Sequence, residues 1–174
     1  MISNEKIVQW RDTLKETVFN VFNTKGDVKN SVIIAKVDED GTVLSTVLDT
    51  SEVPAEYMRS SIQAVINNTR PDAYVICGRR KIILFDEKDT EEMYARVREA
   101  GSVANLEDAI EVMIFVYETK AITNIELYEI IREGDEAVLS KIPMAESTRV
   151  ESEMFFTGML RDYLHNSISE FNLN

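Results

Sequence analysis

Apolar residues recur at helical spacing in several separate stretches of the chain. From about Ser3 to Phe22 they return every three or four positions, and Ser3 or Asn4 can cap the helix that this pattern predicts. Pro54 in a first turn and Gly101 after a last turn mark two more helices. We therefore expect four helices, at residues 3–22, 54–68, 89–101 and from Thr148 onward, the last with Glu151 in capping-box spacing.

Apolar runs of strand length lie between these helical stretches and predict a β-sheet. Asp38-Glu39-Asp40-Gly41 between two such runs is typical of a hairpin turn, because glycine readily adopts the positive φ that the turn requires. Gly78-Arg79-Arg80 separates two further runs, and we interpret it as a second hairpin turn. The predicted strands are 31–37 and 42–48, then 73–77 and 81–85, then a meander of 109–117, 122–132 and 137–142.

The run at 109–117 is apolar on both sides of the predicted strand, interrupted only by Glu111. Such a strand belongs in the middle of a sheet that is covered on both faces, whereas the alternating run at 137–142 fits a position near an edge. Clustered hairpins favour an α+β class over a doubly wound parallel fold. We expect one domain over residues 1–174, with a mixed, mainly antiparallel sheet of about seven strands packed with four helices, and a frayed tail at 169–174.

The chain has a single histidine, His165, and a single cysteine, Cys77. One of each excludes a structural zinc cluster, a multi-histidine metal centre and a redox dithiol, so no metal or cofactor is expected. The sequence also lacks a G-x-S-x-G elbow, a P-loop and a G-x-G-x-x-G pattern. We interpret Cys77 as a packed thiol and His165 as an exposed residue at the end of the last helix.

Acidic residues outnumber basic residues by 31 to 19, which gives a net charge of −12. Such a surface repels nucleic acids and anionic membranes, so neither is an expected partner. The chain has no apolar run long enough to span a bilayer, no secretory signal pattern and a lone cysteine, from which we expect a cytoplasmic location. The acidic surface either keeps the protein in solution, or it allows the protein to act as an antagonist that imitates DNA and binds a basic protein.

Positive charge is concentrated at Arg70, Arg79, Arg80 and Lys81. On the predicted hairpin these side chains are either solvated or bind a phosphate, a carboxylate ligand or an acidic partner.

A second pattern at the same hairpin resembles the PD-(D/E)xK motif of metal-dependent nucleases, with Pro71-Asp72 followed by Asp86-Glu87-Lys88. The resemblance implies that Asp72 and Asp86 bind magnesium and that Lys88 assists the attacking water. It covers fewer than twenty residues, and Glu118-Thr119-Lys120 matches its second half equally well. Gly78 at the first position of the turn favours a two-residue loop, which places the two aspartates on opposite faces and argues against the metal site.

These patterns together indicate a non-catalytic interaction or ligand-binding domain with an acidic surface, and a nuclease or an acidic antagonist as alternatives. The last predicted helix carries more apolar side chains than one small sheet covers. We therefore expect a protein partner or self-association as a homo-oligomer, with Phe155, Phe156, Met159 and Tyr163 at the interface.

Overall fold

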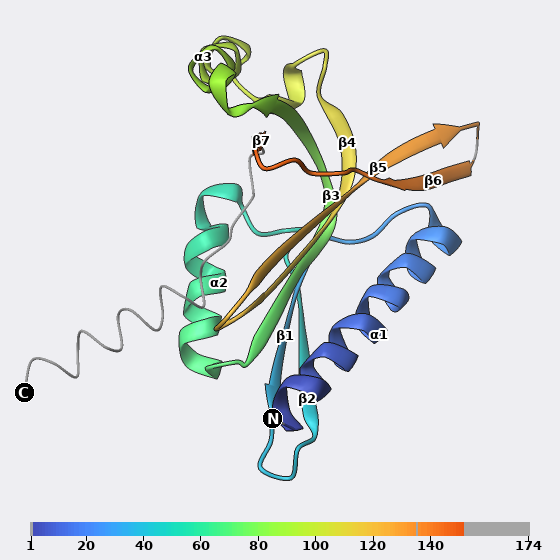
Figure 1. Cartoon of the computed structure of the whole chain (residues 1–174), viewed down its shortest axis with the longest axis vertical. Helices are drawn as coiled ribbons and strands as arrows, with labels where there is room; N and C mark the ends of the chain where they lie inside the picture. Colours follow the sequence, from blue (N-terminus) through green and yellow to red (C-terminus); the bar gives the residue numbers. More distant parts are fainter. Residues whose placement is uncertain (1, 135, 152–174) are drawn as a thin grey trace, which may run out of the picture.

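A curled antiparallel sheet forms the centre of the molecule in the computed structural model, which describes residues 2–134 and 136–151 (Figure 1). The strand order is β2-β1-β3-β4-β5-β6, and β7 pairs with the second half of β3. The α+β class is confirmed, but a mixed sheet is wrong, because every pairing between described strands is antiparallel. The strands are β1 (Ser31–Val37), β2 (Val43–Asp49), β3 (Ala73–Asp86), β4 (Ile110–Thr119), β5 (Thr123–Glu133), β6 (Glu136–Lys141) and β7 (Thr148–Glu151).

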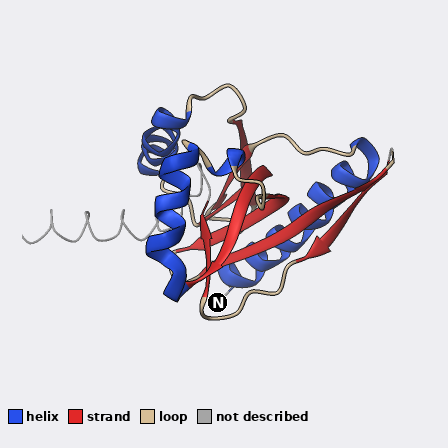
Figure 2. Cartoon of the chain, turned by 90° about the horizontal axis from the view of Figure 1, so that it is seen from above, coloured by secondary structure: helices blue, strands red, loops and turns tan. Residues whose placement is uncertain are grey.

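Three α-helices cover this sheet within the described ranges: α1 (Ile2–Lys25), α2 (Ala55–Thr69) and α3 (Thr90–Ala100). Helices α1 and α2 lie on opposite faces, and α3 packs beside the far end of β3 (Figures 1 and 2). The three helices that the sequence predicts before residue 110 are confirmed within a few residues at each end. No helix in the described ranges is both long enough and apolar enough to cross a bilayer.

The two faces of β4 belong to different hydrophobic clusters. Met113 and Phe115 pack under α1, whereas Val112 and Ile114 pack under α2, and all four side chains are fully buried. Because β4 lies between β3 and β5, the predicted central strand that is apolar on both sides is confirmed. The first hairpin and the final meander are confirmed too, and β6 lies at an edge of the sheet.

The second predicted hairpin is wrong, because residues 73–86 form one continuous fourteen-residue strand, β3. Ten of its residues, Ala73 to Ile82, pair in unbroken register with β4, so the backbone groups around Gly78 are satisfied by a neighbouring strand and no turn is required. Arg79 and Arg80, which belonged to the predicted turn, and Lys81 after them contact partners on other elements.

Gly78 allows a close approach of two backbone segments and does not form a turn. Its φ is 152°, and the chain at Asn30 crosses directly over it. A Cβ atom at this position would lie 2.9 Å from the Cα of Asn30 and closer still to its side-chain oxygen. Glycine is therefore needed for a close backbone approach within a strand, a role that it also has at bulges and barrel corners.

The predicted start of a fourth helix at Thr148 is also wrong. Thr148–Glu151 is strand β7, in which Val150 lies opposite Leu84 and packs against the cluster on the α2 face. Capping-box spacing is satisfied by many sequences, whereas pairing with the exposed end of β3 covers an otherwise open strand. The expected total of seven strands is thus reached because β7 replaces the strand that the second hairpin would have supplied. The rest of the predicted helix, and the predicted frayed tail at 169–174, lie outside the described residues.

Candidate functional site: a groove between α1 and β2

Helix α1 crosses the sheet diagonally, and three side chains fix its path. Lys6 Nζ donates a hydrogen bond to the carbonyl of Gly41, in the turn between β1 and β2. Trp10 Nε1 donates to Ser45 Oγ on β2 at 2.6 Å. One turn and a half later, Lys15 binds Glu126 on β5. The helix therefore begins near the edge strand β2 and moves away from it toward β5 (Figure 1).

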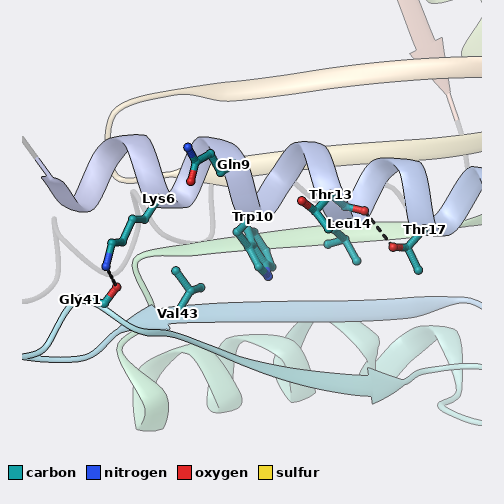
Figure 3. Close-up of a pocket in the computed structure, with 8 residues that line it drawn as sticks. All are labelled: Lys6, Gln9, Trp10, Thr13, Leu14, Thr17, Gly41 and Val43. Carbon is teal, nitrogen blue, oxygen red and sulfur yellow. Dashed lines mark hydrogen bonds between the residues drawn. The ribbon is translucent and has the colours of Figure 1, made fainter.

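This divergence leaves a groove between α1 and β2. Two cavities of about 470 Å³ each follow the helix and adjoin at Leu14 and Thr17, which line both of them; we call the pair the α1–β2 groove. Figure 3 shows its first half, where Trp10 and Leu14 point from α1 toward the strand that carries Val43. The second half is lined mainly by apolar side chains, among them Val18, Val21, Val28, Ile33, Val47 and Cys77.

The charged residues that line the groove are mostly basic, although the whole chain is acidic. Lys6 lies at one end, and Lys25 and Lys29 lie at the other, with Asp27 as the only acidic residue among them. Asp27 is itself 3.6 Å from Arg79 Nη1. At the same end, Lys29 forms an ion pair with Asp49 at 3.0 Å, which offsets part of the positive charge there. The groove is therefore an apolar channel with lysines at both ends.

Cys77 lies in the floor of the groove, in an environment that disfavours the reactive thiolate. The thiol is buried, and this burial raises its pKa to about 11, against a small lowering by the positive charge of Arg80. A thiol with this pKa is protonated at neutral pH, and the thiolate is the reactive form. The prediction that Cys77 is a packed residue agrees with this environment.

The outer wall of the groove is an unusual edge strand. Residues 43–48 of β2 carry no charge, and Leu44 and Val47 are 55% and 63% exposed on its two faces. Natural sheets usually protect an edge with charged residues, proline or a bulge. Strand β2 has none of these between Val43 and Leu48.

A polar cluster fixes the middle of α1 on the sheet. Glu126 accepts hydrogen bonds from Lys15 and from the Tyr128 hydroxyl, and Lys141 lies 3.6 Å away. Burial alone would raise the pKa of Glu126, but the bonds from Lys15 and Tyr128 outweigh it and lower the pKa to about 2. The Lys15 ammonium also lies 5.6 Å from the Tyr128 ring centroid. This cluster holds the helix in the position that opens the groove.

The predicted basic cluster is not brought together. Arg70 ends α2 with a left-handed backbone, and its N–H donates to the carbonyl of Ile66 at 2.8 Å. Arg79, Arg80 and Lys81 lie in the middle of β3, where alternate side chains point to opposite faces of the sheet.

Each of these strand residues has partners on other elements. Arg79 forms ion pairs with Glu111 at 3.1 Å and with Asp27, and Lys81 contacts the carbonyl of Ala104 at 3.4 Å. Arg80 donates to the side chain of Asn30, and burial lowers its pKa.

The residues of the nuclease-like motif lie at opposite ends of β3. Asp72 precedes the strand and accepts a hydrogen bond from the N–H of Val37 at 2.8 Å. Asp86 ends the strand and caps the short 3₁₀ turn that contains Lys88, whose N–H donates to it at 3.1 Å. The two aspartates are fourteen positions apart in extended chain, a separation of roughly 40 Å. They do not form a common site.

No group of three or more His, Cys, Asp or Glu side chains in the described part of the chain is arranged to hold a metal ion. His165 and the predicted interface residues Phe155, Phe156, Met159 and Tyr163 lie outside the described residues. Comparisons of the chain with protein-family models, with curated proteins and with solved structures found no match.

The sequence contained two signals for the groove that the periodicity argument did not use. The second strand of the first hairpin has six consecutive uncharged residues, which is atypical of a solvent-exposed strand. Trp10 lies on the apolar stripe of α1, and tryptophan is enriched where an apolar surface meets a polar partner. Neither signal locates a groove without the path of α1 across the sheet, which depends on the contact between Lys15 and Glu126.

Proposed function

We propose that this chain is a non-catalytic protein-binding domain, and that it binds through the α1–β2 groove and the adjoining edge of β2. The observation that carries the proposal is the exposed apolar channel between Trp10 and Val47, with lysines at both ends. Apolar surface that stays exposed in a folded protein is typical of interaction sites.

The charge of the groove defines the partner that it suits. Lys6, Lys25 and Lys29 favour a segment that has an apolar face and carboxylates at its flanks. The same lysines disfavour a basic partner at this site, which separates this proposal from that of an acidic antagonist. Apolar contact supplies most of the binding free energy, and the lysines select the partner.

A peptide titration tests the proposal directly, because Trp10 is the only tryptophan of the chain and lines the groove. Two synthetic peptides of equal length are compared, one alternating leucine with glutamate and the other alternating leucine with lysine. We expect the acidic peptide to shift the emission of Trp10 in a saturable manner, and the basic peptide to bind at least about tenfold more weakly, a difference of about 1.4 kcal/mol. Equal binding of both peptides, or of neither, contradicts the proposal.

Two substitutions on the same strand supply a matched control. Val47 lines the groove, whereas Leu44 is similarly exposed on the opposite face of β2. Val47→Lys should lower the affinity for the acidic peptide about tenfold, because it removes apolar contact and places a charge where binding must desolvate it. Leu44→Lys should leave the affinity within about a factor of two. The proposal fails if both variants bind alike.

A further inference from the structure

The hydrogen bonds between β2 and β1 determine which backbone groups of β2 point away from the sheet. The N–H of Asp38 donates to the carbonyl of Thr42, and the N–H of Thr50 donates to the carbonyl of Asn30, which fixes the alternation between them. In an antiparallel pair, every second residue directs its N–H and C=O toward the partner strand. Leu44, Thr46 and Leu48 therefore bond to β1, and Val43, Ser45 and Val47 direct their backbone groups away from the sheet.

We infer that the partner at this edge is a second copy of the same chain, which pairs β2 with β2 in antiparallel register about a two-fold axis at Ser45. The inference rests on the proposed binding surface and names its partner. A two-fold axis perpendicular to the sheet keeps the α1 face of both copies on the same side. Each residue of β2 must therefore lie opposite a residue of the second copy whose side chain is on the same face. Centring on Ser45 satisfies this condition and sets Val43 opposite Val47 of the second copy.

This register uses all three outward residues. Val43, Ser45 and Val47 can each exchange backbone N–H···O=C bonds with Val47, Ser45 and Val43 of the second copy. The two valines lie on the α1 face, where Val47 is 63% exposed in the single chain. Pairing covers this apolar side chain and continues the floor of the groove from one copy into the other.

Charge complementarity favours the same register over its neighbours. Centring on Ser45 places Asp49 of the second copy opposite Gly41, the residue whose carbonyl already accepts a hydrogen bond from Lys6. Lys6 and Asp49 both lie toward the α1 face. Asp49 already pairs with Lys29 of its own chain at 3.0 Å, so the two-fold axis brings Lys6 of the second copy to a carboxylate that the two lysines then share. Moving the axis by two residues to Val47 sets Asp49 opposite Ser45 instead, and this contact is lost.

The path of α1 leaves room for this arrangement. Its first turns lie near Gly41, at one end of β2, and the helix then moves inward toward Glu126 on β5. The two-fold axis places the first turns of the second helix near the other end of β2, opposite Asp49. The two helices therefore diverge from the axis, with one α1–β2 groove on each side of it.

Neither of the other free edges in the described part of the sheet offers the same surface. Strand β7, which pairs only with β3, is four residues long and contains Arg149 and Glu151. Strand β6 carries Glu136 and Lys141 at its ends, and it has only one large exposed apolar side chain, Val138. Charged residues at an edge oppose pairing with another strand. Strand β2 also ends with a charged residue, Asp49, but its two exposed apolar side chains, Leu44 and Val47, make it the edge that favours a second copy.

Cysteine crosslinking of the full chain tests the register. Only the residue on the axis faces its own counterpart, so Ser45→Cys should form a disulfide-linked dimer under mild oxidation, with a separation between Cα atoms of about 5.5 Å. Val47→Cys and Leu44→Cys should crosslink at least about tenfold less, because they face Val43 and Thr46 of the second copy. The buried Cys77 gives little background. Strongest crosslinking at Val47 or Leu44 overturns the register.

Sedimentation of the unmodified chain tests the dimer. We expect a two-chain species at micromolar concentration. Lys6→Glu should raise the dissociation constant of the dimer about tenfold. The double variant that combines Lys6→Glu with Asp49→Lys should restore the original dissociation constant. Only monomer at about 100 μM overturns the inference. A dimer that Met159→Lys abolishes and Ser45→Lys leaves intact also overturns it, since the interface then lies after residue 151. A monomeric chain that still binds the acidic peptide contradicts the dimer alone and leaves the proposed binding function standing.

Discussion

The role of an individual residue in this molecule depends on the helix or strand that its side chain contacts. Glu126 is the clearest case, because its carboxylate accepts from Lys15 on α1 and Tyr128 on its own strand. The pKa of Glu126 is about 2 in the folded chain, against 4.5 for a glutamate side chain that is free in water. A group whose pKa is lowered by folding stabilises the fold above its unfolded value, and this stabilisation is lost as the pH falls.

Acid titration of the folded chain tests this explanation. We expect the contribution of Glu126 to stability to be complete above about pH 4.5 and to disappear as the pH falls toward about 2. Glu126→Gln should reduce stability at pH 7 by about 1 kcal/mol and flatten the dependence of Tm on pH within this window. Glu129→Gln, on the opposite face of β5, is the control and should keep the slope of the unaltered chain. Equal slopes for Glu126→Gln and the unaltered chain would show that Lys15 and Tyr128 do not hold this carboxylate.

Gly78 gives a second prediction at this scale. Gly78→Ala should destabilise the chain by about 1–3 kcal/mol, because the added methyl group meets Asn30. Gly101→Ala is the control, since Gly101 also has a positive φ but has no atom within 4 Å of an added Cβ. Chemical denaturation should show the larger loss at Gly78. If the two variants lose equal stability, backbone strain alone accounts for both and the close approach of Asn30 contributes nothing.

Among the elements, those with local signals were predictable and those that depend on distant pairing were not. The hairpin at Gly41 and the strand β4 were evident from turn chemistry and from apolar residues on both faces. The continuity of β3 was not, because Gly78-Arg79-Arg80 has the composition of a turn until β4 is known to run beside it. Strand β7 was hidden for the same reason, since its partner lies more than sixty positions earlier in the chain.

A pair of proline substitutions distinguishes strand β7 from the helix that the sequence predicted. The N–H of Glu87 donates to the carbonyl of Ser147, so alternation directs the N–H of Arg149 toward β3 and that of Val150 away from it. Arg149→Pro should therefore lower stability by at least about 1 kcal/mol more than Val150→Pro.

Arg149→Ala controls for the ion pair between Arg149 and Glu87, which are 2.6 Å apart. In the first turn of a helix both prolines would be tolerated. Equal and small effects of the two prolines would therefore support the helix and contradict the strand.

On the scale of the whole molecule, a sheet buried on both faces leaves its edges as the surfaces that remain available. The diagonal path of α1 turns one of these edges into a groove, and the absence of charge in residues 43–48 leaves that edge open to another strand. The acidic composition predicted either a surface suited to solubility or an acidic antagonist of a basic protein. It did not reveal that Lys6, Lys25 and Lys29 line an apolar groove beside α1.

The central claim is that β2 and the groove beside it form a protein-binding surface, and amide hydrogen exchange resolved by residue tests it most directly. In dilute solution, the amides of Leu44, Thr46 and Leu48 should exchange slowly, whereas those of Val43, Ser45 and Val47 should exchange rapidly. As the chain concentration rises, the account predicts that the second set becomes protected together, while the first set is unchanged. Protection that appears elsewhere and leaves Val43, Ser45 and Val47 in rapid exchange would contradict it.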